Sequence, residues 1–296
     1  MALKKVTVGS RQSHPIQVAV AEIPKKSMVE RMMPLIMVLM LVMAFGLGAM
    51  WSKIKYLEAG GTGGGTGAGT GTGTGAAAQA PQQPAAPEIS MATIKGLFGK
   101  DVLKFGDANS KLVFVEVADP SCPYCHIAAG KNPELNKSAG AQFLMVADGG
   151  TYVPPVEEIR KLLDSGRASY VYIYSNGHGN GEMAQKALYC ANERGKFWEV
   201  HDRLYSSAGY DLINNTVKND KANAQKLAEF LQGTVDTAFV QSCLESGKYD
   251  GRISADQQLA GSLGVQGTPG FFVNTTRFGG AYSWTDMKSA ADAALN

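Results

Sequence analysis

Two cysteines, Cys122 and Cys125, stand two residues apart directly after the apolar run Leu112–Val117. A Cys-x-x-Cys pair that follows a strand lies at the start of a helix, where the two sulfurs can close a small disulfide. A thiolate is stabilised at such a position, so the disulfide can open and close during a reaction. The spacing is compatible with redox chemistry, metal binding or a structural bridge, and the rest of the sequence has to separate these.

The positions of the two cysteines predict different roles. Cys122 is expected at the helix N-terminus with its sulfur exposed, where free N–H groups lower its pKa. Cys125 lies one turn further on and should be more buried, so we expect Cys122 to react with substrate and Cys125 to resolve the mixed disulfide. His126 follows Cys122 by four residues and would share its helix face. As an imidazolium it would stabilise the thiolate; the alternative is a solvated histidine.

Glu116 interrupts the apolar strand six residues before Cys122. A buried carboxylate is costly unless it is paired or protonated. Strand alternation places Glu116 on the same face as Leu112 and Phe114, both apolar, so we predict that it points inward as a proton acceptor for Cys125. If it points outward, it is an ordinary surface residue.

A proline-containing turn, Gly267–Gly270, precedes the short strand Phe271–Val273. In a chain with a Cys-x-x-Cys helix, Thr268–Pro269 suggests a cis peptide bond that turns the Thr268 backbone toward the sulfurs. There it could pair with an extended substrate. A common type I or II turn is the alternative.

The N-terminal part contains an apolar run of 20 residues, Met32–Trp51. A helix of that length spans about 30 Å, roughly one hydrocarbon core. Basic residues before the run outnumber those shortly after it, which predicts a cytoplasmic segment (1–31), a transmembrane helix (32–52) and an extracytoplasmic C-terminal part. A cleaved signal peptide is the alternative, although the segment before the run is long for one and lacks a clear cleavage site.

Residues 53–88 are rich in Gly, Thr, Ala, Gln and Pro and predict a flexible linker. The folded part is expected over 89–296. Residues 91–296 carry 20 Lys and Arg against 22 Asp and Glu, so no excess of positive charge indicates a nucleic-acid partner.

The folded part alternates strands and helices in an α/β order. Strands are predicted at 112–117, 169–174 and 271–273, with a hairpin partner at 277–282. A helix is expected from Cys122 to about Asn136, although Gly130 and Pro133 weaken its far end, and another covers 156–163. A helical insertion of about 178–263 separates the second and third strands, and a final helix covers 285–295. The run 142–147 could be a strand or a buried loop.

Taken together, these motifs resemble the DsbA-like branch of the thioredoxin superfamily. The resemblance rests on Glu116, Cys122-Pro-Tyr-Cys125 and Thr268-Pro-Gly-Phe-Phe-Val-Asn274, and on segments 189–205, 239–248 and 263–269. It covers about 90–296. It implies a thioredoxin fold with an inserted helical subdomain, and a redox-active Cys122–Cys125 disulfide in place of any cofactor or metal.

The resemblance also implies site residues beyond the two cysteines. Catalytic roles fall to Pro269 and Glu116, and we expect substrate contacts from Thr268, Pro123, Tyr124 and His126. Relatives with cysteines at the places of Cys190 and Cys243 would pair them in a structural disulfide; two buried free thiols are the alternative.

Two features depart from the family pattern. The stretch 140–155 is longer than usual and could reshape the groove beside the active site. The inner dipeptide is Pro-Tyr, whereas the strongest oxidases of the family carry Pro-His.

The leading hypothesis is a membrane-tethered thiol:disulfide oxidoreductase, monomeric and acting as an oxidase. Its partners would be extracytoplasmic cysteine-containing proteins and a membrane quinone-linked reoxidant. An isomerase or reductase of the same fold is the alternative, although isomerases usually add a dimerisation domain. From other classes, Cys122, Cys125 and His126 could belong to a zinc module, or the fold could bind peptides without catalysis.

Overall fold

The computed structural model describes residues 89–296. The predicted cytoplasmic segment (1–31), transmembrane helix (32–52) and linker (53–88) lie outside the described residues. Within 89–296, none of the helices combines the length and the apolar character needed to cross a membrane.

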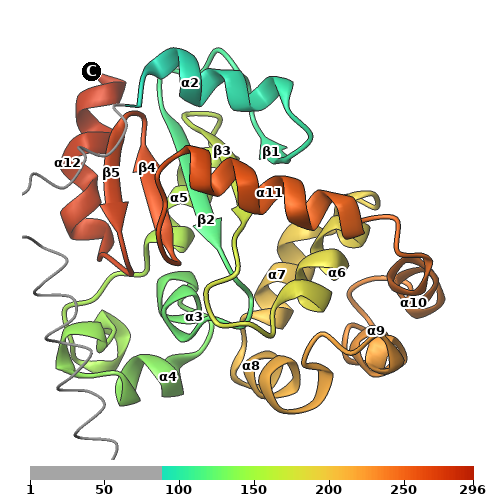
Figure 1. Cartoon of the computed structure of the whole chain (residues 1–296). Helices are drawn as coiled ribbons and strands as arrows, with labels where there is room; N and C mark the ends of the chain where they lie inside the picture. The colour runs from blue at the N-terminus through green and yellow to red at the C-terminus, as the bar shows by residue number, and fades with distance from the viewer. Residues whose placement is uncertain (1–88) are drawn as a thin grey trace, which may run out of the picture. The chain divides into compact units, whose positions relative to one another are not determined.

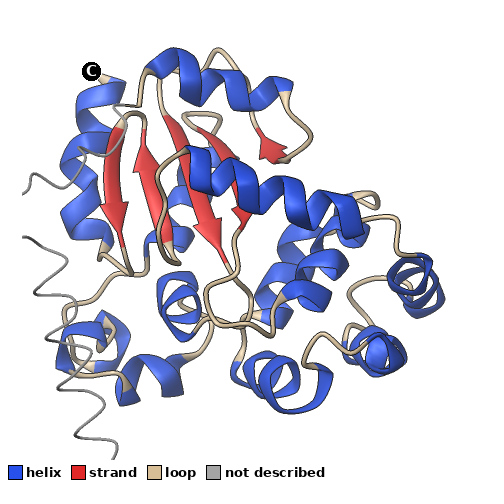
Figure 2. Cartoon of the chain, in the orientation of Figure 1, coloured by secondary structure: helices blue, strands red, loops and turns tan. Residues whose placement is uncertain are grey.

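A five-stranded sheet forms the centre of the described part (Figures 1 and 2). Its strands, in spatial order, are β1 (Leu103–Phe105), β3 (Ser169–Tyr174), β2 (Val113–Ala118), β4 (Gly270–Val273) and β5 (Thr276–Gly279). β2 and β3 are parallel, and the other neighbouring pairs are antiparallel. β2 is therefore an inner strand, and its carboxyl end leads directly to the two cysteines.

Strand alternation divides the core between the two faces of the sheet. Val113, Val115 and Val117 of β2 pack in one apolar cluster with residues of α2 (Met91–Gly96) and α11 (Asp250–Ser262). Phe114 of β2 belongs to a larger cluster to which most of the other helices contribute. Figure 1 shows α2 and α11 across the near face of the sheet.

The other helices come from several parts of the chain. They are α3 (Pro123–Ala129), α4 (Pro133–Ser138), α5 (Pro155–Asp164), α6 (Glu182–Asn192), α7 (Phe197–Leu204), α8 (Ser207–Asp211), α9 (Ala224–Phe230), α10 (Thr237–Ser246) and α12 (Trp284–Leu295). α6 to α11 all lie between β3 and β4 in sequence, which confirms the predicted α/β fold with a helical insertion.

Some elements differ from the sequence predictions. The helix after Cys122 ends at Gly130, whose φ of 71° stops it in the left-handed region, and α4 is a separate helix. α2 and the three-residue β1 were not predicted, because both are too short for a periodic pattern. The run 142–147 is neither a strand nor a buried loop, because its residues are exposed or half-buried. It overlaps two 3₁₀ turns, Ala141–Phe143 and Val146–Asp148, and its Met145 forms an isolated bridge with Tyr152.

Candidate active site

The two cysteines lie where β2 gives way to α3. Cys122 is the N-cap residue of α3, with extended backbone angles, and Pro123 occupies the first helical position. Both cysteines are free thiols in this structure. Cys125 is fully buried, and Cys122 exposes 5% of its surface. The prediction of an exposed Cys122 sulfur is therefore wrong: the residue is buried, and its sulfur contacts the Thr268 carbonyl oxygen.

Contacts around Cys122 favour its thiolate. Its pKa falls to about 6, first because the Cys125 thiol hydrogen-bonds to it, with smaller contributions from Thr268 and from the backbone amides of Cys125 and Tyr124; burial opposes the shift. As a thiol, Cys122 donates to the Thr268 carbonyl oxygen, at 3.3 Å. A large part of Cys122 is therefore ionised and nucleophilic at neutral pH.

Cys125 has the opposite electrostatic character. Burial, and then the hydrogen bond to Cys122, raise its pKa well above the ordinary value. The backbone N–H of Asp119 donates to its sulfur at 3.4 Å. The pair thus combines a reactive outer sulfur with a protonated inner one, as the sequence positions predict.

Glu116 lies on the same face of β2 as Phe114, as alternation predicts, and is fully buried; both faces of this strand are covered. Burial raises its pKa to about 7, while a hydrogen bond from the Tyr170 hydroxyl acts in the opposite direction. Its second oxygen, Oε1, finds no hydrogen-bond partner among the described residues. A carboxyl group that titrates near neutral pH can accept and return a proton.

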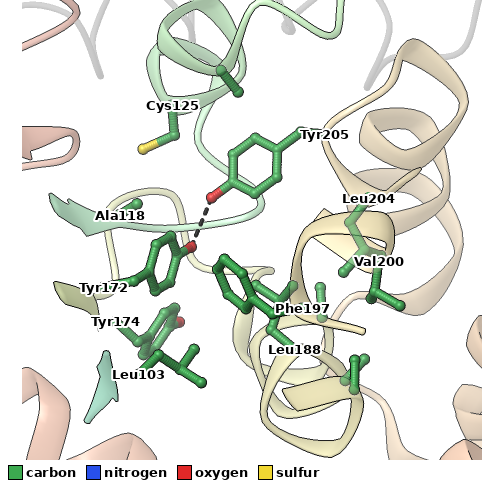
Figure 3. Close-up of a cluster of buried hydrophobic side chains, with 14 of the residues drawn as sticks. Leu103, Ala118, Cys125, Tyr172, Tyr174, Leu188, Phe197, Val200, Leu204 and Tyr205 are labelled. Atoms are coloured by element: carbon green, nitrogen blue, oxygen red, sulfur yellow. Dashed lines mark hydrogen bonds between the residues drawn. The ribbon is translucent and has the colours of Figure 1, made fainter. Parts of the chain in front are cut away.

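Aromatic side chains surround the buried end of the site. The hydroxyls of Tyr172 and Tyr205 lie 2.8 Å apart and link β3 to the residue after α7. Figure 3 shows this pair in one cluster with Cys125. Cys125 therefore belongs to a cluster that both the sheet and the helical insertion form.

His126 does not lie where the sequence analysis expected it. It is fully buried, with Nδ1 2.9 Å from the Tyr205 carbonyl and Nε2 2.8 Å from the Pro120 carbonyl. Burial lowers its pKa to about 4, although both carbonyl contacts act in the opposite direction. At that pKa the ring is neutral at pH 7 and its single N–H can donate to only one of the two carbonyls. It cannot supply the predicted imidazolium or touch a substrate at the surface. Instead it links α3 to the helical insertion, whose packing a sequence pattern does not reveal.

The Thr268–Pro269 peptide bond is cis, as predicted. Thr268 also lines an open groove of about 440 Å³ beside Cys122. The other groove-lining residues are Tyr124, Gln142, Phe143, Tyr152, Gly279, Gly280, Ala281, Tyr282, Ser283 and Asp286. The long stretch 140–155 thus forms one wall, and Tyr124 and Tyr282, 49% and 45% exposed, leave the groove an apolar rim.

Cys190 and Cys243 form a disulfide, with Cα atoms 6.2 Å apart, which confirms the implied pairing. Both sulfurs lie near a Glu193 carboxylate oxygen, but bridged cysteines provide no thiolate for a metal. Beside Cys122 and Cys125, both ring nitrogens of His126 lie against backbone carbonyl groups. That arrangement counts against a zinc module built from Cys122, Cys125 and His126.

Three residues near the site were not predicted from the sequence: Asp119, Tyr170 and Tyr205. Asp119 directly follows β2, and a buried carboxylate at a strand end is a signal that could have been noticed. Tyr170 lies on the same sheet face as Glu116, but its contact with that residue depends on strand register. Tyr205 belongs to the helical insertion, and sequence patterns do not predict how that insertion packs against the sheet.

Comparisons with known proteins agree with this fold. Residues 155–293 match the family model described as Thioredoxin. That match includes Pro269 but begins after the Cys122–Cys125 pair. The family match and the sheet topology support a thioredoxin-like α/β fold with a helical insertion.

The curated relatives are sodium/proton antiporters. NhaA 3 of Salinispora tropica is 29% identical over 193 residues, which cover 64% of this chain and 24% of the antiporter. NhaA 1 of Salinispora arenicola is 27% identical over 200 residues, with the same coverage. The chain thus spans about a quarter of the length of the curated relatives it matches.

Several solved structures are similar to the chain. Oxidised BdbD from Bacillus subtilis aligns with a TM-score of 0.49 and 16% identity, covering 67% of this chain and 94% of BdbD. Wolbachia pipientis α-DsbA1 aligns with a TM-score of 0.48 and 19% identity, covering 66% and 91%. The catalytic domain of Proteus mirabilis ScsC aligns with a TM-score of 0.47 and 16% identity, covering 69% of this chain and 96% of that domain.

Proposed function

We propose that the protein is a thiol:disulfide oxidoreductase that oxidises cysteine-containing proteins through Cys122 and Cys125. One observation supports this more than any other. The outer sulfur has a pKa of about 6, while the inner sulfur, directly behind it, has a raised pKa. This asymmetry is what a reversible disulfide exchange requires.

The reaction begins with the Cys122–Cys125 disulfide. A substrate thiolate attacks Cys122 Sγ, the Cys122–Cys125 bond breaks, and its electron pair goes to Cys125 Sγ. Cys125 then takes up a proton, for which protonated Glu116 is the nearby donor. A second substrate thiolate attacks the substrate sulfur of the mixed disulfide, and Cys122 leaves as a thiolate. The substrate gains a disulfide and the enzyme holds two cysteines in reduced form.

The low pKa of Cys122 favours this direction. A stabilised thiolate stabilises the reduced enzyme, so the disulfide form becomes the stronger oxidant. A new cycle needs an oxidant for the cysteine pair, and we propose a quinone-linked membrane protein for that step. Substrate segments would bind across Thr268 and along the apolar groove, in contact with Tyr124.

Exchange chemistry is tested by incubating the oxidised full chain with a reduced peptide that contains two cysteines. We expect the peptide to become oxidised. In a separate incubation with the oxidised peptide, the Cys122 thiolate of a Cys125→Ala variant attacks the peptide disulfide, one peptide sulfur leaves as a thiol, and the mixed disulfide accumulates because Cys125 is absent to resolve it. Cys122→Ser, the matched control, should form none. Peptide oxidation by Cys122→Ser at the wild-type rate would contradict the proposal.

We also propose that the catalytic domain acts outside the cytoplasm, tethered by residues 32–52. The apolar run and the basic residues before it support this, and the two curated relatives are named as antiporters. The test is alkaline carbonate extraction of membranes that contain the full chain. The chain should stay with the lipid; release into the supernatant would contradict tethering.

A further inference from the structure

The carboxylate of Asp119 joins the loop before Cys122 to a second loop, residues 177–181, which begins 58 residues further along the chain. This second loop contains Gly177, Gly179 and Gly181 and is called the glycine-rich loop below. Asp119 is fully buried. Its Oδ2 accepts the N–H groups of Gly177 and His178, both at 2.8 Å. Its Oδ1 accepts the N–H of Ser121 at 2.8 Å and the Ser121 hydroxyl at 2.7 Å. Four hydrogen bonds therefore hold one carboxylate in place between the two loops.

The glycine-rich loop passes close enough to require glycine at two positions. A Cβ atom on Gly181 would lie 1.8 Å from Asp119 Oδ1, and one on Gly177 would lie 1.8 Å from Thr268 Oγ1. Neither distance leaves room for a side chain. The absence of side chains at Gly177 and Gly181 therefore lets the loop approach Asp119 and the Thr268 turn at the same time.

Asp119 contacts both cysteines through its backbone. Its carbonyl oxygen accepts the N–H of Cys122 at 2.9 Å. Its own N–H donates to Cys125 Sγ at 3.4 Å. The glycine-rich loop thus fixes the side chain of Asp119, and the backbone amide of the same residue donates to Cys125 Sγ.

We propose that Asp119 is a positioning residue: anchored by the glycine-rich loop, it aims its N–H at Cys125 Sγ and stabilises that sulfur as it leaves. This inference rests on the proposed exchange function. When a substrate thiolate attacks Cys122, the breaking bond sends its electron pair to Cys125. A fixed N–H donor favours the developing thiolate, because hydrogen bonds to charged acceptors are stronger than those to neutral ones.

Two reactions of Cys122 separate this role from a general structural one. Opening of the Cys122–Cys125 disulfide by an added thiol requires Cys125 to leave. Alkylation of reduced Cys122 by iodoacetamide does not involve a leaving Cys125. A positioning residue that acts on Cys125 should change the first rate and leave the second unchanged.

The experiment uses the full chain with Asp119→Asn and Gly181→Ala, which disturb the same contact from opposite sides. Asp107→Asn is the matched control, because exposed Asp107 also accepts a backbone N–H, at 2.8 Å from Asn109. Glutathione opens the oxidised disulfide, and iodoacetamide alkylates the reduced protein. We expect opening to slow about tenfold in both variants, with alkylation at the wild-type rate and no change in the control.

Two outcomes would overturn the inference: opening at the wild-type rate in the variants, or opening and alkylation slowed by the same factor. If Asp119→Asn does not fold, Gly181→Ala decides, because it leaves the Asp119 charge in place. Failure of the proposed function would look different, since the wild-type protein itself would then not exchange disulfides with glutathione or with the dithiol peptide.

Discussion

The hydroxyl of Tyr170 donates a hydrogen bond to the carboxylate of Glu116, and both side chains are fully buried. Among the described residues Glu116 forms no ion pair, so the hydrogen bond from the Tyr170 hydroxyl is what stabilises its charged form. Burial still dominates and raises the pKa of Glu116 to about 7. The acid beneath the cysteines therefore titrates in the pH range where exchange would occur.

This pKa makes stability depend on pH. A carboxyl group whose folded pKa is raised favours folding while it is protonated, and that contribution is lost as pH rises from about 4.5 to about 7. The total is about 3 kcal/mol. Glu116→Gln should thus be more stable than wild type at pH 8 by up to that amount, with little difference at pH 4.5. Urea unfolding at the two pH values measures it.

The matched control is Glu245→Gln, which removes an exposed carboxylate. Tyr170→Phe offers a second check, because losing the hydroxyl should raise the pKa of Glu116 further in a carboxyl-carbon NMR titration. A Glu116→Gln protein with no stability gain at pH 8 would show that the carboxylate is better solvated than this structure indicates.

The Cys122 thiolate should titrate near pH 6 in the reduced protein. Cys125→Ala removes the hydrogen bond that contributes most to this shift, so the midpoint should move upward toward the ordinary value of about 9. The measurement is thiolate absorbance at 240 nm against pH, with Cys122→Ser as the control that lacks the transition. An unchanged midpoint in Cys125→Ala would mean that other contacts set the Cys122 pKa.

The Cys190–Cys243 disulfide should stabilise the domain without taking part in exchange. It joins α6 to α10 across a sequence separation of 53 residues, for which loop-closure entropy gives about 4 kcal/mol. The double variant Cys190→Ala/Cys243→Ala should lose about that much free energy of unfolding while still oxidising peptides. A folded double variant without exchange activity would assign this bridge a redox role instead.

The apolar groove should affect substrate binding more than sulfur chemistry. Tyr282→Ser removes an exposed aromatic side chain from the rim and should raise KM for an apolar dithiol peptide by about tenfold. Opening of the disulfide by glutathione should be unchanged. The matched control is Val146→Ser, because Val146 is 59% exposed but does not line the groove. Equal KM changes in both variants would contradict specific binding there.

Local pattern predicted the parts of the site that lie close together in sequence. Cys122, Cys125 and Glu116 all belong to one strand–helix junction, where alternation gave the face of Glu116 and helix position gave the burial of Cys125. The burial of Cys122 was missed, because it depends on contact with the distant residue Thr268. The cis Thr268–Pro269 bond and the Cys190–Cys243 bridge were expected from resemblance to relatives, with alternatives left open.

The contacts that sequence analysis missed join distant segments. Asp119 meets its amide donors 58 residues later, and Tyr170 reaches Glu116 through the pairing of β2 with β3. His126 was expected near solvent, but the insertion covers it with Tyr205. Such contacts depend on how separate elements dock, which strand alternation and helix periodicity do not specify.

The reduction potential of the Cys122–Cys125 pair tests the central claim most directly. Lowering the pKa of Cys122 from 9.0 to about 6 stabilises the reduced form. At pH 7 the effect is about 1.4 kcal/mol, or about 30 mV for two electrons. This contribution is full above pH 9 and is lost as pH falls through 6. The reactive cysteine of thioredoxin has a pKa of about 7, so against thioredoxin the same arithmetic leaves about 1 kcal/mol, or about 20 mV. Equilibration with glutathione buffers should therefore give a potential about 20 mV more positive than the thioredoxin value of about −270 mV. A potential at or below that value, or no titration of the pair, would contradict an oxidase.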